Sequence, residues 1–162
     1  MGRLILVLLF FCNVTVVFSQ KVFSLYSPDN CLEVRINIGE KMEYSVWKGG
    51  ERLLCNSSLS MLLGDGQKWG HRALVRKIQR RKADRNISSP FYKKAHVKDC
   101  YNELELHFRG DYGVIFRAYN DGVAYRFIST GKKSFVVKEE TVEYCFPDDW
   151  KSHVAFVRTQ GY

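Results

Sequence analysis

Apolar and polar residues alternate one by one in several segments, and this period of two constrains the fold more than any other feature. In residues 32–38 and 103–108 every second side chain is apolar. Successive side chains of a β-strand point to opposite faces of a sheet, so this pattern is typical of a strand with one buried face. The sequence therefore predicts sheets that bury one face in a core.

Turn residues separate the predicted strands. Gly64-Asp65-Gly66 ends one apolar run, and Asn120-Asp121-Gly122 predicts a tight hairpin between strands at 114–118 and 123–128. Asn, Asp and Gly tolerate the positive φ that a two-residue hairpin turn requires. About ten strands, with turns every eight to twelve residues or so, are typical of a β-sandwich. We predict an all-β fold of this kind, with further strands at 134–138 and 142–146.

The stretch from Ala73 to Arg85 admits two interpretations. Leu74 and Ile78 have the i, i+4 spacing of a helix, whereas Val75 and the arginines suit an exposed strand. We predict a strand, because the neighbouring segments are strands. Residues 86–90 are predicted to form a loop.

The first nineteen residues resemble a targeting segment. Arg3 precedes the apolar run Leu4–Phe11, and Ser19 is a small residue before a plausible cleavage point ahead of Gln20. The apolar run is too short to span a bilayer. We predict a signal peptide at 1–19, a β-sandwich domain at 20–162, no transmembrane segment after cleavage, and export to the periplasm or the outside of the cell.

Four cysteines remain once Cys12 is removed with the signal peptide. They are Cys31, Cys55, Cys100 and Cys145, and none has the CxxC spacing of a metal site. In an oxidising compartment they permit one or two disulfides, and the pairing cannot be chosen from the sequence. Buried free thiols are an equally good interpretation.

Positive charge is concentrated in one region. The formal net charge is +8, and nine Lys and Arg residues lie between Arg72 and Lys94 with Asp84 as the one acidic residue among them. Such a stretch could bind phosphate groups or an anionic glycan. More often it is a solvated strand or loop. We expect no nucleic-acid partner.

No complete set of catalytic residues is found in the sequence. Glu103 and Glu105 lie on the same face of a predicted strand, roughly 6–7 Å apart. That separation falls within the range of paired glycosidase carboxylates. Alternating glutamates on a solvated strand face are the commoner arrangement, and we favour it. We therefore predict no catalytic residue and no metal ligand in this chain.

Five residues are candidates for binding carbohydrate. Trp69 lies in a turn-rich segment and could stack on a sugar ring, although a tryptophan in a β-sandwich is more often part of the core. Arg117 and Arg126 flank Asn120 and Asp121 on the two strands of the predicted hairpin. Cross-strand surface pairing would explain the two arginines equally well.

The segment from Phe116 to Arg126 resembles the N-terminal domain of glycoside hydrolase family 97, the retaining and inverting α-glycosidases of bacterial polysaccharide breakdown. Further similar pieces follow the family's order along about residues 22–150. They are Ser27-Pro-Asp-Asn, Tyr44-Ser-Val, Tyr101-Asn-Glu-Leu, Glu140-Thr141, Phe146-Pro147 and Trp150.

The resemblance implies a galactose-mutarotase-like β-super-sandwich that packs on a (β/α)₈ barrel. In the family the barrel carries most catalytic glutamates and calcium ligands. The N-terminal domain lends one glutamate to the calcium site, and the corresponding position falls beyond Tyr162. We therefore expect calcium only in the complete enzyme, and we assign no catalytic or metal-binding residue to this chain.

Three functions follow as hypotheses. The leading one is the carbohydrate-binding-type N-terminal domain of a secreted α-glycosidase, present as a truncated or split product with an incomplete sandwich and inactive alone. Its partners would be an oligosaccharide or polysaccharide and a separately encoded barrel. The alternatives are a stand-alone secreted glycan-binding module and a polyanion-binding protein that uses Arg72–Lys94.

Overall fold

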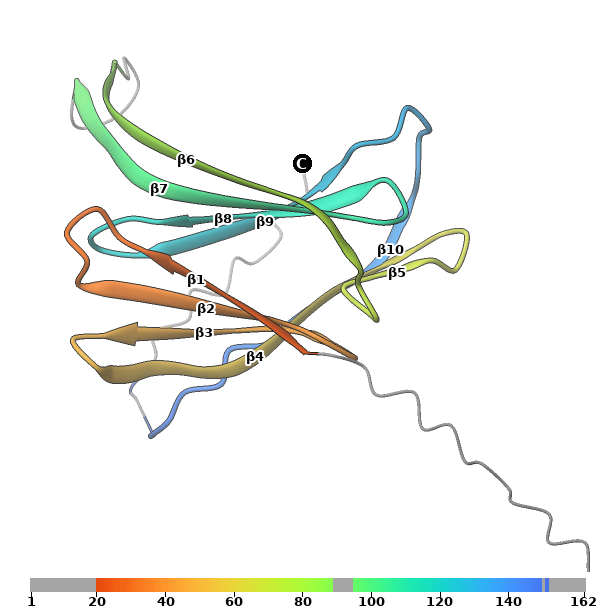
Figure 1. Ribbon diagram of the computed structural model, residues 1–162, viewed down its shortest axis with the longest axis horizontal. Helices are drawn as coiled ribbons and strands as arrows, with labels where there is room; N and C mark the ends of the chain where they lie inside the picture. The colour runs from red at the N-terminus through yellow and green to blue at the C-terminus, as the bar shows by residue number, and fades with distance from the viewer. Residues whose placement is uncertain (1–19, 89–94, 150, 152–162) are drawn as a thin grey trace, which may run out of the picture.

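The computed structural model describes residues 20–88, 95–149 and 151, which form an all-β fold of two antiparallel sheets that face each other (Figure 1). The predicted fold class is confirmed. The predicted signal peptide at 1–19 lies outside the described residues.

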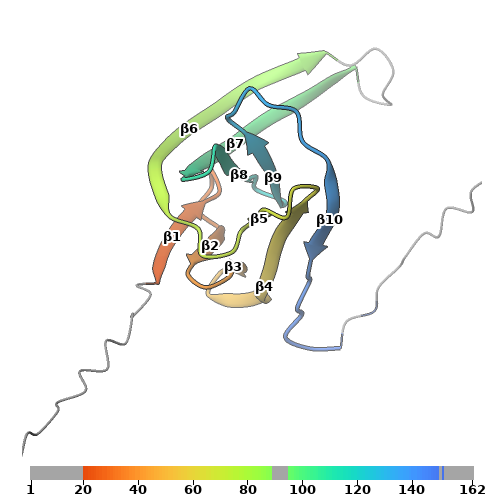
Figure 2. The ribbon, with the colours of Figure 1, turned by 90° about the vertical axis from the view of Figure 1, so that its right-hand side faces the viewer.

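The first sheet has the strand order β1-β2-β3-β4-β10, with β5 paired to β4. Its strands are β1 (Lys21–Tyr26), β2 (Leu32–Ile38), β3 (Met42–Lys48), β4 (Glu51–Leu63), β5 (Lys68–Trp69) and β10 (Val137–Val142). The second sheet has the order β6-β7-β8-β9, formed by β6 (Val75–Ser88), β7 (His96–Phe108), β8 (Tyr112–Ala118) and β9 (Val123–Ser129). Figure 2 shows β10 on the side of the sandwich opposite β1 and β6.

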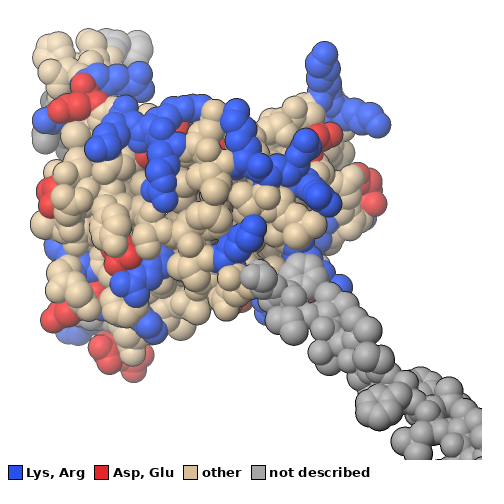
Figure 3. All heavy atoms as spheres, in the orientation of Figure 1, with Lys and Arg blue, Asp and Glu red and all other residues tan. Residues whose placement is uncertain are grey.

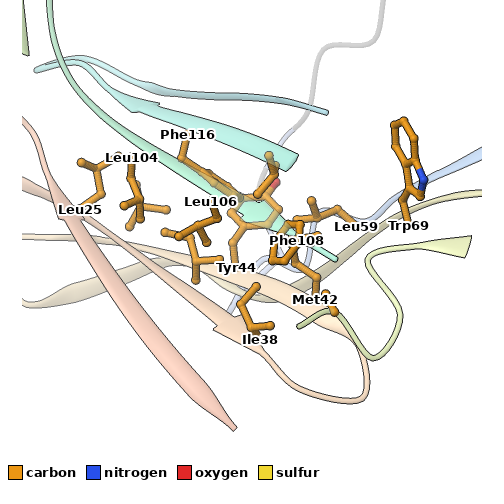
Figure 4. Close-up of a cluster of buried hydrophobic side chains, with 14 of the residues drawn as sticks. Leu25, Ile38, Met42, Tyr44, Leu59, Trp69, Leu104, Leu106, Phe108 and Phe116 are labelled. Carbon is orange, nitrogen blue, oxygen red and sulfur yellow. The ribbon is translucent and has the colours of Figure 1, made fainter. Parts of the chain in front are cut away.

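The core lies between the two sheets and follows the alternation of the sequence. In β2 the four apolar positions are buried and the three polar positions between them are partly exposed. From the second sheet Leu104, Leu106 and Phe116 point toward Tyr44 of β3 (Figure 4). The ring centroids of Tyr44 and Phe116 are 5.8 Å apart. Burial of these apolar faces is therefore what joins the sheets.

Side-chain hydrogen bonds join the sheets at one end. The Asn102 side-chain amide of β7 donates to the carbonyl oxygen of Tyr26 in β1 at 2.8 Å. The backbone N–H of Asp29, in the turn after β1, donates to Oδ1 of Asn120 at 3.2 Å. The Ser27-Pro-Asp-Asn piece thus forms the first hairpin turn, where Asn30 has a φ of 59°.

The predicted hairpin at 120–122 is present, but its geometry differs from the prediction. The loop has four residues, because Ala118 pairs with Val123 and the N–H of Tyr119 donates to the carbonyl oxygen of Gly122 at 2.8 Å. None of Asn120, Asp121 and Gly122 has a positive φ. Loops of this length are most often built around a type I turn, which needs no positive φ.

Several predicted boundaries were wrong. The basic stretch is strand β6, as predicted, but the strand continues through 86–88 because β7 pairs with it to Ser88. The two strands expected at 134–138 and 142–146 are replaced by β10, whose Val142 pairs with Leu59. The apolar run that ends at Gly64 is the last part of the long strand β4, which has irregular pairing with β3.

The core predicts a large difference between two leucine truncations. Leu106→Ala removes a fully buried side chain and should lower the free energy of unfolding by about 3 kcal/mol, through lost burial and the cavity left behind. Leu74→Ala, at a half-exposed position, should cost less than about 1 kcal/mol. Urea unfolding of both variants measures this, and equal losses would contradict the assignment of the core.

Candidate functional site

A large hollow of the described residues is a groove between the sheets, which we name the inter-sheet groove. It has a volume of about 610 Å³ and is bordered by β3, β4, β9 and β10. It lies on the side of the sandwich where β10 is the edge strand of the first sheet. Figure 2 shows where β10 runs. Two of the five predicted carbohydrate-binding residues, Asn120 and Asp121, line the groove.

Aromatic side chains form much of the wall of the inter-sheet groove. Tyr44 and Tyr125 lie side by side with their ring centroids 5.7 Å apart. Tyr144 and Phe146, in the segment after β10, are 63% and 55% exposed. Exposed aromatic rings beside polar groups suit the C–H faces of sugars, which pack against π-systems.

The polar residues of the groove come from separate elements. Asn120 and Asp121 lie at the β8–β9 turn, Glu140 lies in β10, and Lys48 ends β3. Together they place amide, carboxylate and ammonium groups around an apolar floor. This is the composition of a small-molecule site, with a mainly apolar surface and a few polar groups that orient the ligand.

Two tyrosines of the groove stay protonated to high pH. Burial, and then the neighbouring Tyr144 and Tyr125, raise the pKa of the Tyr44 phenol to about 12. Burial, and then Glu140 and Tyr144, raise the pKa of Tyr125 to about 12 as well. Both phenols are therefore neutral at physiological pH, when each can donate and accept hydrogen bonds.

The other three predicted carbohydrate-binding residues lie elsewhere. Arg117 and Arg126 line a shallow hollow of about 110 Å³ between β8 and β9. Trp69 is buried against Tyr112, with nearly parallel rings whose centroids are 4.9 Å apart. It lines a different hollow, of about 440 Å³, beside Phe135. The five predicted residues thus fall at three places in the fold.

Four groove aromatics were missed by sequence reasoning. Tyr44 and Tyr125 sit on inward faces of predicted strands and read as core residues. Tyr144 and Phe146 alternate at the end of an expected strand, and their exposure depends on how β10 pairs. The alternation of Tyr144 and Phe146 with polar or small residues was the one feature of the sequence that could have indicated an aromatic binding surface.

The prediction that Glu103 and Glu105 form a solvated face was wrong. They are 3% and 6% exposed. Arg117 of β8 donates from Nε to Glu103 at 2.8 Å, and Arg81 of β6 reaches the same carboxylate at 3.3 Å. Long arginine side chains from both neighbouring strands cover the glutamates of the middle strand, and this explains their burial.

Glu105 completes the same ion-pair network. Nε2 of His107 lies 2.8 Å from its Oε1, and Nη2 of Arg81 lies 3.0 Å from its Oε2. The contact between Arg81 and Oε2 of Glu105 is an ion pair but not a hydrogen bond, since this buried oxygen has no hydrogen-bond partner. Both glutamates are engaged by cations, so the arrangement serves structure better than proton transfer.

The basic stretch lies on the edge strand β6, where Lys and Arg side chains gather on the face shown in Figure 3. Arg85 forms an ion pair with Asp99 at 2.9 Å, and Arg81 is held by the two glutamates. Part of the positive charge is thereby neutralised. Polyanion binding stays a prediction, and Lys93 and Lys94 lie outside the described residues.

The described part of the chain contains no group of three or more His, Cys, Asp or Glu side chains that could hold a metal ion. Within the same residues, no helix is long and apolar enough to cross a membrane.

The two facing sheets and their aromatic groove define an antiparallel β-sandwich domain. The family model described as Glycosyl-hydrolase 97 N-terminal matches residues 25–161. The chain belongs to this family. The resemblance inferred from the segment Phe116–Arg126 is thereby confirmed.

Known proteins support the assignment. A retaining alpha-galactosidase of Bacteroides thetaiotaomicron is 43% identical over 141 residues, which cover 87% of this chain and 21% of that protein. A glycoside hydrolase family 97 enzyme from Pseudoalteromonas sp. strain K8, solved with panose, matches 78% of this chain and 20% of its own, with a TM-score of 0.69 and 20% identity. A beta-arabinopyranosidase structure matches 77% and 21%, with a TM-score of 0.69 and 28% identity. The chain spans about a fifth of the length of these proteins.

The ion-pair network predicts that Glu103 stabilises the fold. Glu103→Ala leaves two arginines without their shared carboxylate and should lower the free energy of unfolding by about 2–3 kcal/mol. Glu139→Ala, at an exposed position in β10, should change it by less than about 0.5 kcal/mol. Chemical denaturation measures both. A Glu103→Ala variant as stable as the parent would contradict the structural role.

The raised pKa of Tyr125 predicts a loss of stability at alkaline pH. Between pH 10 and about 12 the phenol ionises in the unfolded chain but stays protonated in the fold, so stability falls as pH rises. Tyr125→Phe should make this fall shallower, whereas Tyr26→Phe, at an exposed tyrosine, controls for loss of a hydroxyl. Urea unfolding at several pH values tests this, and an unchanged slope in Tyr125→Phe would refute it.

Proposed function

We propose that this chain is the carbohydrate-binding-type N-terminal domain of an exported family 97 α-glycosidase, and that it binds oligosaccharides in the inter-sheet groove. The observation that carries the proposal is the pair of exposed rings, Tyr144 and Phe146, beside Asn120 and Asp121. Family membership supports a role in carbohydrate metabolism.

A sugar ring would lie with its C–H face against Tyr144 or Phe146. Its hydroxyls would reach the Asp121 carboxylate, the Glu140 carboxylate and the side-chain NH₂ of Asn120, whose Oδ1 accepts from the N–H of Asp29. The groove is open to solvent and its polar groups come from separate elements, so the hydrogen bonds contribute little and stacking on the aromatic rings supplies most of the binding energy. We expect weak binding, with a Kd on the order of 1 mM.

Hydrolysis would belong to a (β/α)₈ barrel that this chain does not include. The match covers 21% of the alpha-galactosidase, so the remaining four-fifths of such a protein is long enough to contain a (β/α)₈ barrel. The ion pairs of Glu103 and Glu105 support the same division of roles. Calcium would be needed only in the complete enzyme.

Galactose-containing oligosaccharides with α-linkages are the first ligands to test, because the 43% identical relative is a retaining alpha-galactosidase. Starch-like α-glucosides are the second, because a more distant family 97 structure is described in complex with panose. A stand-alone glycan-binding module would behave in the same way in solution. A domain of a glycosidase should associate with a separately produced (β/α)₈ barrel, whereas a stand-alone module should not.

Calorimetric titration with an α-galactooligosaccharide tests the groove. Tyr144→Ala should weaken binding at least about tenfold, because it removes a stacking surface. Phe135→Ala, at an exposed aromatic outside the groove, is the matched control and should leave the affinity unchanged. Loss of binding in Phe135→Ala alone would place the site at the hollow beside Trp69 instead.

Activity assays test the division of roles. The purified chain should not turn over an aryl α-galactoside or α-glucoside above the rate of a mock purification. Turnover that follows the chain through purification would contradict the assignment of catalysis to the barrel.

A further inference from the structure

Cys55 and Cys145 face each other where the segment after β10 lies along β4. The backbone N–H of Cys55 donates to the carbonyl oxygen of Cys145 at 2.7 Å. The N–H of Cys145 donates to Oγ of Ser57 at 3.0 Å. Glu143 donates from its N–H to the carbonyl oxygen of Ser58 at 3.1 Å, so the antiparallel alignment of β10 with β4 continues past Val142.

The direct backbone hydrogen bond makes Cys55 and Cys145 neighbours across the two segments, although the pair is not a regular ladder pair, because the N–H of Cys145 bonds to Oγ of Ser57 instead of the carbonyl oxygen of Cys55. A disulfide needs Cα atoms within about 7 Å of each other. Residues joined by a direct backbone hydrogen bond lie in this range. Desolvation, followed by the charge of the Cys55 thiol and a hydrogen bond with it, raises the pKa of the Cys145 thiol, so the two sulfur atoms lie close together.

We propose that Cys55 and Cys145 are a disulfide-forming pair that fastens the segment after β10 to β4. A small-molecule disulfide, such as oxidised glutathione, is the oxidant. One cysteine thiolate attacks it and releases one glutathione thiol, which gives a mixed disulfide on the protein. The second thiolate then displaces the other glutathione. Two protein thiols lose two protons and two electrons, and one oxidant molecule becomes two thiols.

The other two cysteines of the described chain have different surroundings. Cys31 lies in the exposed turn before β2, where its thiol contacts the carbonyl oxygen of Asp29 at 3.7 Å. Cys100 lies in β7 opposite Asp84 of β6. Among the described residues, the hydrogen-bonded pair Cys55 and Cys145 is the one that the backbone brings together, so the structure favours the 55–145 pairing over the alternatives.

The bond would fix one wall of the inter-sheet groove. Tyr144 and Phe146 flank Cys145 in sequence and line the groove, whereas Cys145 itself does not. Most side chains of β10 are exposed, so this strand has little burial of its own to hold it on β4. A covalent link to β4 would restrict the positions of both aromatic rings and stabilise the sheet edge.

Peptide mapping tests the pairing directly, because trypsin leaves each of these cysteines on its own peptide. Cys55 falls on residues 53–68, Cys145 on 139–151, Cys31 on 22–35 and Cys100 on 99–109. The purified full chain is equilibrated with reduced and oxidised glutathione, alkylated, and digested without reduction. We expect the 53–68 and 139–151 peptides to be joined, two hydrogen atoms lighter than their sum, and to separate on reduction.

Two results would overturn the proposal. One is alkylation of both Cys55 and Cys145 after oxidation, and the other is a link from either of them to Cys31 or Cys100. A thermal readout adds a second test. Reduction should lower the Tm of the oxidised chain by about 5–10 °C. It should leave the Tm of Cys145→Ser unchanged, whereas Cys31→Ser should respond like the parent.

Discussion

The contact between the inner faces of the two sheets is the interaction on which the rest of the structure depends. Tyr44 and Phe116 meet at its centre, and the alternating apolar residues of β2, β3, β7 and β8 extend it in both directions. At one end of the sandwich the sheets are joined by two hydrogen bonds, in which the Asn102 amide donates to Tyr26 and Oδ1 of Asn120 accepts from the N–H of Asp29. On the β10 side the inter-sheet groove lies between residues of β3 and β4 and residues of β9 and β10. The candidate site is therefore a consequence of where the core ends.

The outer face of the second sheet shows how a charged sequence can be buried. Glu103 lies under arginines from both neighbouring strands, and the guanidinium of Arg117 also packs on the ring of Tyr101 at 4.3 Å. Each cation offsets the desolvation of the carboxylate. The network ties β6 to β7 and β8, and it also neutralises part of the basic stretch. The same ion pairs thus hold the side chains of this face in place and reduce the positive charge that is available to a polyanion.

The sequence predicts the fold well because period-two alternation is local and depends on few partners. Residues 32–38 and 103–108 need only one buried face to become strands, and the family segment Phe116–Arg126 places the β8–β9 hairpin. The site was harder to predict, because it depends on strand pairing. The exposure of Tyr144 follows from the register of β10 on β4, and the burial of Glu103 follows from side chains on two other strands. No pattern within a single segment contains that information.

The central claim is that the inter-sheet groove binds carbohydrate. Amide chemical-shift mapping during titration with an α-galactooligosaccharide tests it most directly, because every described strand reports separately. We expect shifts at residues 120–125 and 140–146, with β6 unaffected. Shifts confined to β6 or to the surroundings of Trp69, or no shifts at millimolar ligand, would contradict it.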